Sequence, residues 1–242
     1  FQKRTIDVVY TKKELAKPRE NPFGETNGDL KYGLEFEKEE YDQIDQYCKE
    51  KEIAWFVSPW DEKSVDFAEQ YNPPCHKIAS ATLTDDSLLQ YIRSKGRPII
   101  LSTGMSTLEQ IDQAVEVLGK KDLIILHSCS TYPASYDELN LKVIPALRER
   151  YGVLVGYSGH ELGYLPTLTA VSMGAIAIER HYTLDNQMTG FDHKMSLGPK
   201  EFIDMVKGIR DIQKIQGTGK KIVSETEWIT RNKYHVSMVS SQ

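Results

Sequence analysis

The sequence predicts an α/β fold in which parallel strands form a (β/α)8 TIM barrel. Short apolar runs rich in β-branched residues recur along the chain, and each is followed by a polar loop and a segment with helical spacing. Successive runs lie roughly 21 to 27 residues apart, which is the length of one βα unit with short loops. The runs do not alternate between apolar and polar residues, and this indicates strands buried on both faces of a sheet.

The predicted elements follow one another in βα order. Strands are expected at 54–58, 76–80, 97–103, 123–128, 153–158 and 174–180, with Phe1–Gln2 as the end of a further strand. Helices are expected at 61–71, 85–94, 106–119, 141–151, 164–173 and 199–216. The eighth strand is expected before Phe1. Neither a G-x-G-x-x-G nor a Walker-type phosphate loop occurs, which favours the barrel over a doubly wound open sheet.

The helix at 106–119 has the clearest pattern of the predicted helices. Ser106 and Glu109 are spaced as a capping box. An apolar stripe with i, i+3, i+4 and i+7 spacing is formed by Ile111, Ala114, Val115 and Leu118. Residues 11–31 are instead rich in Pro, Gly, Asn and charged residues, so we expect a long functional loop there.

The composition excludes several classes of protein. The 242 residues are 40% hydrophobic and contain no apolar run that approaches the length of a membrane span. A formal net charge of -5 with dispersed Lys and Arg argues against a nucleic-acid-binding surface. The three cysteines, Cys48, Cys75 and Cys129, form no CxxC pair, which is typical of a reducing compartment. We therefore expect a cytoplasmic protein without nucleic-acid or membrane partners.

Polar and charged side chains gather at the carboxyl ends of the predicted strands, where barrels build their active sites. They are Ser58, Lys77, Ser80, Ser102, Thr103, His127, Ser128, Ser130, Ser158, His160, Glu179, Arg180 and His181. A single hydroxyl at such a position is more often a helix cap. Hydroxyls at five strand ends around one lysine are suited to a phosphate-bearing ligand. Lys77 lies within a strand otherwise fit for burial, so we expect an anionic partner for it.

The histidines indicate a metal site. His160 and His181 end consecutive strands, so in a barrel they are neighbours, and with a nearby carboxylate they would suit Mn²⁺, Fe²⁺ or Zn²⁺. Each histidine taken alone is more often a packing residue. His127, which has the pattern of a core residue, and His193, in a long loop, are weaker candidates. Covalent catalysis is disfavoured, because Ser158 and His160 are too close in sequence for a Ser–His pair and no G-x-S-x-G elbow occurs.

Six segments spread over nearly the whole chain carry a family resemblance: KIAS, PIILSTGM, ILHSCSTYP, VGYSGH, GAIAIERHYTLD and FDHKMSLGPKEF. In this order they resemble the sialic acid synthase family, which comprises the phosphoenolpyruvate-dependent N-acetylneuraminate synthases and relatives that make legionaminic, pseudaminic and spore-coat sugars. The resemblance implies that C3 of phosphoenolpyruvate attacks the open-chain aldehyde of an N-acyl-mannosamine. Water then adds at C2, and phosphate leaves by C–O cleavage to give a nonulosonic acid.

The same resemblance implies roles for individual residues. Phosphoenolpyruvate would be held by Lys77, Ser80, Ser102, Ser130 and Ser158, with Ser58 joining them. His160 and His181 would bind a divalent metal, expected to be Mn²⁺, with Mg²⁺, Fe²⁺ or Co²⁺ as alternatives. The acceptor sugar would face Glu179, Tyr132 and Asp192, and Gln2 lies at the family's second-strand site. The expected catalytic residues are Glu179, Lys77 and Tyr132.

Three positions depart from the family's pattern. The common Ser-Asp-His reads Ser158-Gly159-His160 here, which removes a carboxylate that could support the metal ligands. Thr82 stands where many members place an acidic residue for the acceptor, and the loop reads GFDH where GPDH is usual. These departures bear on the acceptor more than on the chemistry, so the sugar need not be N-acetylmannosamine itself.

The resemblance also implies parts outside this chain. The barrel domain is expected over 1–230 without its first βα unit, and 231–242 would begin a linker to a C-terminal antifreeze-like domain. That domain reaches across a dimer in relatives, so the full-length protein is expected to be a homodimer.

Two other functions stay open. One is another phosphoenolpyruvate-dependent 3-deoxy-sugar-acid synthase that uses a phosphorylated aldose, for which Arg180 is the one arginine at the predicted strand ends. The other is an inactive barrel that binds sugar phosphates.

Overall fold

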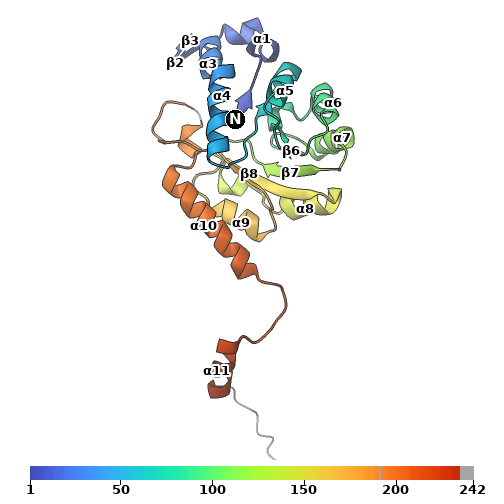
Figure 1. The fold of residues 1–242 in the computed structure, drawn as a ribbon, viewed down its shortest axis with the longest axis vertical. Coiled ribbons are helices and arrows are strands. Elements are labelled where there is room, and N and C mark those ends of the chain that lie inside the picture. Colours follow the sequence, from blue (N-terminus) through green and yellow to red (C-terminus); the bar gives the residue numbers. More distant parts are fainter. Residues whose placement is uncertain (191, 235–242) are drawn as a thin grey trace, which may run out of the picture.

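Five parallel strands form the central sheet of the structure, a computed structural model that describes residues 1–190 and 192–234. In spatial order they are β5 (His76–Ile78), β6 (Ile99–Ser102), β7 (Leu123–Ser128), β8 (Leu154–Gly159) and β9 (Ile178–Arg180). The spatial order equals the sequence order, so each connection is a crossover of the kind found in barrels. Figure 1 shows the sheet curling around a central axis.

A second pair of parallel strands continues this curl. β1 (Gln2–Lys3) pairs with β4 (Ser58–Pro59), and Gln2 lies opposite Ser58. Ser58 Oγ donates a hydrogen bond to the carbonyl oxygen of Lys77 on β5 at 3.2 Å, which joins the pair to the central sheet. The described part of the chain therefore follows the barrel order that the sequence predicts. The structure does not test the eighth strand, because that strand is expected before Phe1.

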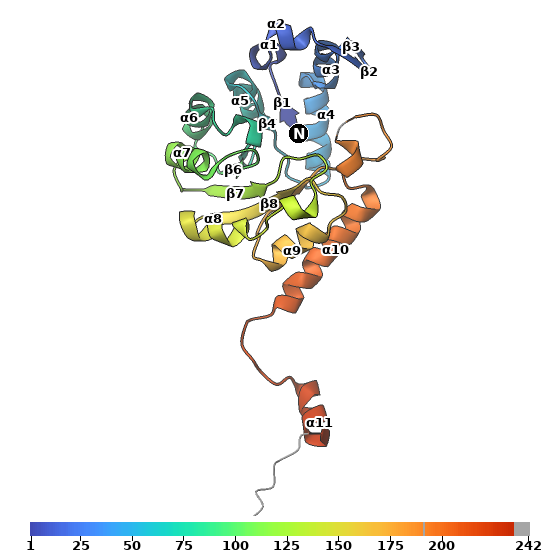
Figure 2. The same cartoon turned by 180° about the vertical axis from the view of Figure 1, so that it is seen from behind.

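Helices follow the strands and cover the outer face of the sheet (Figures 1 and 2). They are α5 (Glu62–Glu69), α6 (Asp86–Ser94), α7 (Leu108–Leu118), α8 (Val143–Tyr151), α9 (Leu165–Ser172) and α10 (Pro199–Gln216). Short 3-10 turns lie at Ser80–Thr82, Tyr136–Glu138 and His193–Met195. Each of the six predicted helices is present within a few residues of its expected bounds.

The predicted capping box of α7 is wrong by one residue. Thr107, not Ser106, is the N-cap: its side chain accepts from the backbone N–H of Gln110, and Gln110 reaches back to the Thr107 N–H at 2.9 Å. The Ser106 hydroxyl instead donates to the Gly104 carbonyl at 3.3 Å. The predicted apolar stripe of this helix is confirmed, since all four of its residues are buried.

The segment 11–31 is not the long loop that the sequence predicts. It contains α2 (Lys12–Leu15), the antiparallel hairpin of β2 (Pro18–Asn21) and β3 (Gly24–Thr26), and the start of α3 (Asn27–Leu34). Two further helices that the sequence did not indicate are α1 (Ile6–Val9) and α4 (Lys38–Glu50). The elements of 11–31 are short and polar, so they carry no apolar periodicity from which to predict them.

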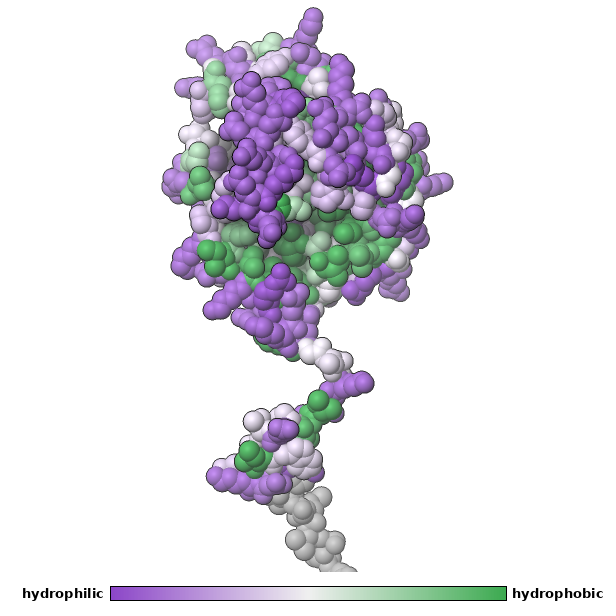
Figure 3. Space-filling model, viewed as in Figure 1, coloured by the Kyte–Doolittle hydropathy of each residue, from purple (hydrophilic) through white to green (hydrophobic). Residues whose placement is uncertain are grey.

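The core lies between the sheet and the helices that cover it. Ile78, Leu101, Ile125 and Val155 from four neighbouring strands are at most 1% exposed and belong to one buried cluster. Each such side chain contributes roughly 1.5 to 3 kcal/mol by its removal from water. A second, smaller cluster surrounds the fully buried ring of Tyr41 on α4. In the view of Figure 3 the upper surface is mostly hydrophilic, and hydrophobic side chains gather in the lower half of the rounded body.

The last described helix, α11 (Glu225–Tyr234), lies apart from the barrel beyond residues 217–224 (Figure 1). It crosses position 230, where the predicted barrel domain ends, so the predicted linker at 231–242 begins inside a helix. Residues 235–242 of that linker lie outside the described residues. None of the described helices is both long and apolar enough to cross a membrane.

Candidate active site

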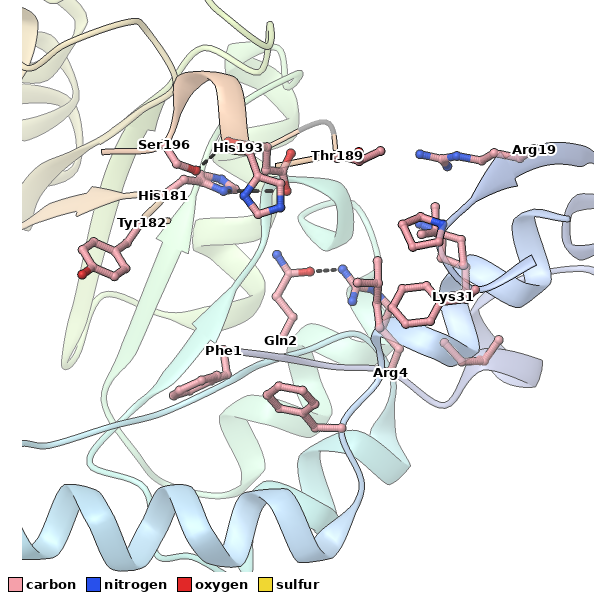
Figure 4. A pocket seen from close by; sticks show the side chains of 18 of the residues that line it. Phe1, Gln2, Arg4, Arg19, Lys31, His181, Tyr182, Thr189, His193 and Ser196 are labelled. Atoms are coloured by element: carbon pink, nitrogen blue, oxygen red, sulfur yellow. Dashed lines mark hydrogen bonds and ion pairs between the residues drawn. The ribbon is translucent and has the colours of Figure 1, made fainter. Parts of the chain in front are cut away.

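A cavity of about 330 Å³ lies at the carboxyl ends of the strands. Ten of the twelve predicted site residues line it: Gln2, Ser58, Lys77, Ser80, Ser102, Tyr132, Ser158, His160, Glu179 and His181. Asp192 lines an adjoining cavity that also contacts Gln2 and His181 (Figure 4). Ser130 lies beside Ser80, because a Cβ placed on Gly104 would approach the hydroxyls of both residues. The predicted site residues, chosen because they end strands, therefore lie close together in the structure.

Lys77 places a buried cation inside the cavity. Its side chain is 7% exposed, its Nζ lies 3.5 Å from Glu179 Oε2, and it donates to the Ile78 carbonyl at 3.2 Å. Burial lowers the pKa of Lys77, and the charge of Glu179 opposes this shift. Ser158 Oγ donates to Glu179 Oε1 at 2.7 Å, so one network joins β5, β8 and β9. A buried ammonium group needs anionic partners, and Glu179, with a side chain 40% exposed, is one.

Buried hydroxyls near Lys77 are available to a ligand. Ser102 Oγ and Ser130 Oγ are shielded from solvent and have no hydrogen-bond partner among the described residues. Such groups are uncommon, since a buried polar atom without a partner costs about 1 to 3 kcal/mol. Ser80 Oγ accepts from the Gly104 N–H at 2.9 Å. Ser58 Oγ is occupied by the Lys77 carbonyl, as described above, and so holds β4 against β5.

Gly104 makes this arrangement of hydroxyls possible. A Cβ on this residue would lie 2.0 Å from Ser130 Oγ and 2.9 Å from Ser80 Oγ, so both hydroxyls would have to move away. Glycine at this position leaves both hydroxyls where they are. One lysine and several hydroxyls thus converge, and groups of this kind bind oxyanions.

His160 and His181 face each other at 5.2 Å between ring centroids. We assign the proton of His160 to Nδ1, which lies 2.9 Å from the Cys129 carbonyl oxygen; Nε2 is then left to accept. Burial, with a further contribution from His181, lowers the pKa of His160 to about 4. Burial also lowers the pKa of His181. Both rings are therefore neutral near pH 7, which is the form that binds metal ions.

The surroundings of these histidines come from two loops. The Tyr132 ring packs 4.4 Å from the His160 ring and 6.1 Å from the His181 ring, centroid to centroid. Asp192 Oδ2 lies 3.7 Å from His181 Nδ1. Among the residues that the structure describes, no group of three or more His, Cys, Asp and Glu side chains could hold a metal ion. The two histidines would therefore form a two-ligand site with open positions.

The two weaker histidine candidates have structural partners. His127 is 9% exposed, and its Nε2 lies 2.7 Å from the Leu139 carbonyl oxygen, as expected of a core histidine. His193 Nδ1 lies 2.7 Å from Thr183 Oγ1, so this ring ties two parts of the loop after β9 together.

A buried ion pair that the sequence did not indicate lies next to the two histidines along the chain. Glu161 follows His160, Arg180 precedes His181, and their side chains are 0% and 1% exposed. Arg180 Nη1 lies 3.0 Å from Glu161 Oε1, and Tyr157 Oη donates to Glu161 Oε2 at 2.7 Å. The guanidinium group of Arg180 thus serves the fold. Arg180 also lies at the wall of the active-site cavity, as its place at a strand end predicts.

The ion pair also explains the departure at Gly159. A Cβ at this position would lie 2.7 Å from Glu161 Oε2 and 2.8 Å from Tyr157 Cε1. The Glu161 carboxylate therefore fills the space that an aspartate side chain at 159 would need. A carboxylate is present next to the histidines after all, two residues further along the chain and paired with Arg180.

Comparison with known proteins assigns the chain to a family. Residues 1–221 match the NeuB family. The chain belongs to the NeuB family. Within it, this chain is 42% identical over 197 residues to an uncharacterized protein of Methanocaldococcus jannaschii, covering 80% of this chain and 58% of that protein. It is 31% identical over 245 residues to human N-acetylneuraminate-9-phosphate synthase, covering 99% of this chain and 68% of that enzyme.

A solved NeuB-family structure supports the same assignment. The sialic acid synthetase of Leptospira borgpetersenii, in complex with citrate, superposes with a TM-score of 0.78 at 33% identity, covering 87% of this chain and 76% of that one. The predicted family and the TIM-barrel-like α/β fold are therefore confirmed. The chain spans little more than half the length of the archaeal relative, so the activity of the whole protein is treated below as a proposal.

Proposed function

We propose that this NeuB-family chain carries the catalytic barrel of an enzyme that condenses phosphoenolpyruvate with an N-acyl-mannosamine-type sugar. The products would be a nonulosonic acid and phosphate. The observation that carries the proposal is the convergence of buried Lys77 with the unpartnered hydroxyls of Ser102 and Ser130. Matched relatives named as synthases of N-acetylneuraminate 9-phosphate, diacetyllegionaminic acid and pseudaminic acid support it.

The reaction balances without an oxidant or reductant. C3 of phosphoenolpyruvate attacks the aldehyde carbon of the open-chain sugar, and a C–C bond forms while the aldehyde oxygen gains a proton. Water adds to C2, the C2–O bond to phosphate breaks, and inorganic phosphate leaves. The protein must therefore hold two oxyanions on one substrate, position an aldehyde above C3 and exclude stray water.

Phosphoenolpyruvate would bind at the oxyanion site. Its phosphate and carboxylate would be held by Lys77, Ser80, Ser102, Ser130 and Ser158, with Ser58 holding the Lys77 strand in place. The bound anion would supply the further negative charge that the buried ammonium of Lys77 requires. Glu179 would orient Lys77 and Ser158 through the two contacts described above.

The acceptor sugar would lie on the side of the cavity formed by Glu179, Tyr132 and Asp192. Gln2 adds a polar group on this side: its Oε1 accepts from Arg4, and its side chain lies below His181 and His193 in Figure 4. Tyr132 would cover the aldehyde end, because its ring already packs against both histidine rings.

We also propose a divalent metal, Mn²⁺ first, with Mg²⁺, Fe²⁺ or Co²⁺ as alternatives, at His160 and His181. The residues fit, since both imidazoles are neutral near pH 7 and the His160 proton is held by a carbonyl oxygen. Water and substrate oxygens would fill the remaining positions. When bound, such a metal would polarise the aldehyde oxygen of the acceptor.

The proposal is tested on the full-length protein with phosphoenolpyruvate and a panel of N-acyl-mannosamines that includes 2,4-diacetamido-2,4,6-trideoxymannose. We expect acceptor-dependent phosphate release and a sugar acid of matching mass. Binding of phosphoenolpyruvate without phosphate release on any acceptor would favour the inactive barrel instead. The further proposal that the full-length protein is a cytoplasmic homodimer is tested by sedimentation and by fractionation of its cell of origin.

A further inference from the structure

Met105 has a backbone conformation that methionine rarely adopts. Its φ is +61°, in the left-handed region that favours glycine and asparagine. Among the described residues, the other non-glycine residues with positive φ are Glu52, Asn72, Asp122 and Asn140. Three of these four are Asn or Asp, whose short polar side chains tolerate the region. Methionine has no such side chain, so this conformation costs free energy at position 105.

The neighbouring residues hold the loop around Met105 on both sides. Before it, the Gly104 N–H donates to Ser80 Oγ at 2.9 Å. After it, the Ser106 hydroxyl donates back to the Gly104 carbonyl at 3.3 Å, and Thr107 is the N-cap of α7. Because the ends of this short turn are fixed, Met105 is the residue that takes up the left-handed conformation.

Packing does not explain why a methionine is held in this way. The Met105 side chain is 70% exposed, although methionine is more often buried. It lies on the border between the active-site cavity and a second cavity of about 650 Å³ between α7 and α8. Of the described non-glycine residues with positive φ, Met105 alone lines the active-site cavity. Strain that burial does not offset, at the edge of a binding cavity, is typical of a functional position.

Met105 borders the cavity beside the proposed oxyanion site. It follows β6, and the backbone of the adjacent Gly104 lies against the hydroxyls of Ser80 and Ser130. The two histidines of the proposed metal site follow β8 and β9, which are two and three strands further along the sheet. An anion held by the hydroxyls therefore has Met105 as an apolar neighbour.

Phosphoenolpyruvate needs such a neighbour at its carbon end. C3 is the nucleophile of the proposed condensation, and a proton taken from water would divert it. In that side reaction C3 gains the proton, water adds at C2, the C2–O bond to phosphate breaks, and pyruvate and phosphate leave. A thioether side chain donates no proton and adapts its shape to a ligand, so it is suited to keeping water away from this carbon.

We infer that Met105 covers the C2–C3 double bond of bound phosphoenolpyruvate and keeps bulk water from C3. This inference rests on the proposed function, which puts phosphoenolpyruvate at Lys77 and the neighbouring hydroxyls. Binding then buries the exposed methionine, and this apolar burial offsets the cost of its backbone conformation. Met105 thereby makes the enzyme specific for the aldehyde, and not water, as the partner of C3.

Oxidation of methionine by hydrogen peroxide measures the contact directly. The full-length protein is treated with peroxide with and without saturating phosphoenolpyruvate, and sulfoxide formation at each methionine is followed by mass spectrometry of its peptides. We expect phosphoenolpyruvate to slow the oxidation of Met105 by at least about threefold. Met188 is the internal control: it is 52% exposed in the loop after β9 and does not line the active-site cavity, so its oxidation rate should not change.

Three variants separate the apolar cover from the backbone conformation. Met105→Asn suits a positive φ but removes the cover, so it should weaken phosphoenolpyruvate binding by about five- to tenfold and release about one pyruvate or more for each sugar acid. Met105→Leu restores an apolar side chain and should recover most of the affinity and of the coupling. Glu52→Asn is the matched control: it changes an exposed residue of positive φ outside the cavity, and both quantities should stay as they are.

The outcomes distinguish this inference from the proposed function. Equal oxidation of Met105 with and without bound phosphoenolpyruvate, or a Met105→Asn variant that binds and couples like the unchanged protein, would overturn the cover and leave the condensation intact. If no acceptor is turned over, the condensation fails. Protection of Met105 and weaker binding by Met105→Asn would then still uphold the cover, whereas no binding of phosphoenolpyruvate in calorimetry refutes both proposals.

Discussion

The buried pair of Glu161 and Arg180 offers the sharpest prediction about stability. Glu161→Gln keeps the shape of the side chain and removes its charge. Arg180 then remains 1% exposed without an anionic partner, although its hydrogen bonds to the Gly163 carbonyl at 2.8 Å and to Thr167 at 3.0 Å persist. Because this buried charge has no compensating partner, we expect a large loss of folding stability.

The size of this loss of stability follows from the burial of both Glu161 and Arg180. Breaking a fully buried pair by removing one partner costs about 3 to 5 kcal/mol. For a protein of this length each kcal/mol lowers the melting temperature by about 2 to 4 °C, so Glu161→Gln should lower it by about 6 to 20 °C. Because the pair joins the residues next to His160 and His181, the variant should also bind Mn²⁺ more weakly.

Thermal melts and urea unfolding followed by circular dichroism measure this loss. The matched control is Asp112→Asn, which breaks the ion pair between Arg150 and Asp112, whose side chains are 46% and 38% exposed. A surface pair of this kind should matter far less. A loss in Glu161→Gln no larger than that in the control would refute the account of the buried pair.

Three further predictions concern single positions. Gly159→Asp should lower the melting temperature, because the new side chain would meet the Glu161 carboxylate within 3 Å; no change in this variant contradicts the packing. Gly104→Ala should raise the KM for phosphoenolpyruvate by about tenfold or more by displacing Ser130 and Ser80, and an unaltered KM counts against the oxyanion site. His181→Ala should abolish Mn²⁺ binding, measured by calorimetry, with an unchanged circular dichroism spectrum; retained binding would refute the metal proposal.

Much of the fold could be predicted because its strands and outer helices depend on apolar pattern. The stripe of α7 and the buried runs of β7 and β8 identify themselves by periodicity and length alone. The hairpin and helices of residues 6–34 could not be predicted in this way. They are held by caps and by close contacts such as that of Phe23 with Gly33, and such contacts depend on residues whose proximity the linear sequence does not reveal.

The candidate site was predictable to the extent that a barrel gathers its strand ends. That rule brings Lys77, Ser158 and Glu179 together from three strands. It is silent about the buried pair of Glu161 and Arg180, because nothing in the linear sequence shows that these two side chains meet. The family resemblance, in turn, directed attention to the missing aspartate at Gly159. The glutamate that fills the same space two residues later could have been noticed as a second carboxylate beside His160.

The most direct test of the central claim follows the oxygen that bridges C2 and phosphorus in phosphoenolpyruvate. The full-length protein is given phosphoenolpyruvate labelled with ¹⁸O at that oxygen, together with the acceptor that supports turnover, and both products are analysed by mass spectrometry. The proposed condensation predicts that the label leaves with phosphate and that one sugar acid forms for each phosphate released. Label retained in the organic product, or phosphate released without a sugar acid, would contradict it.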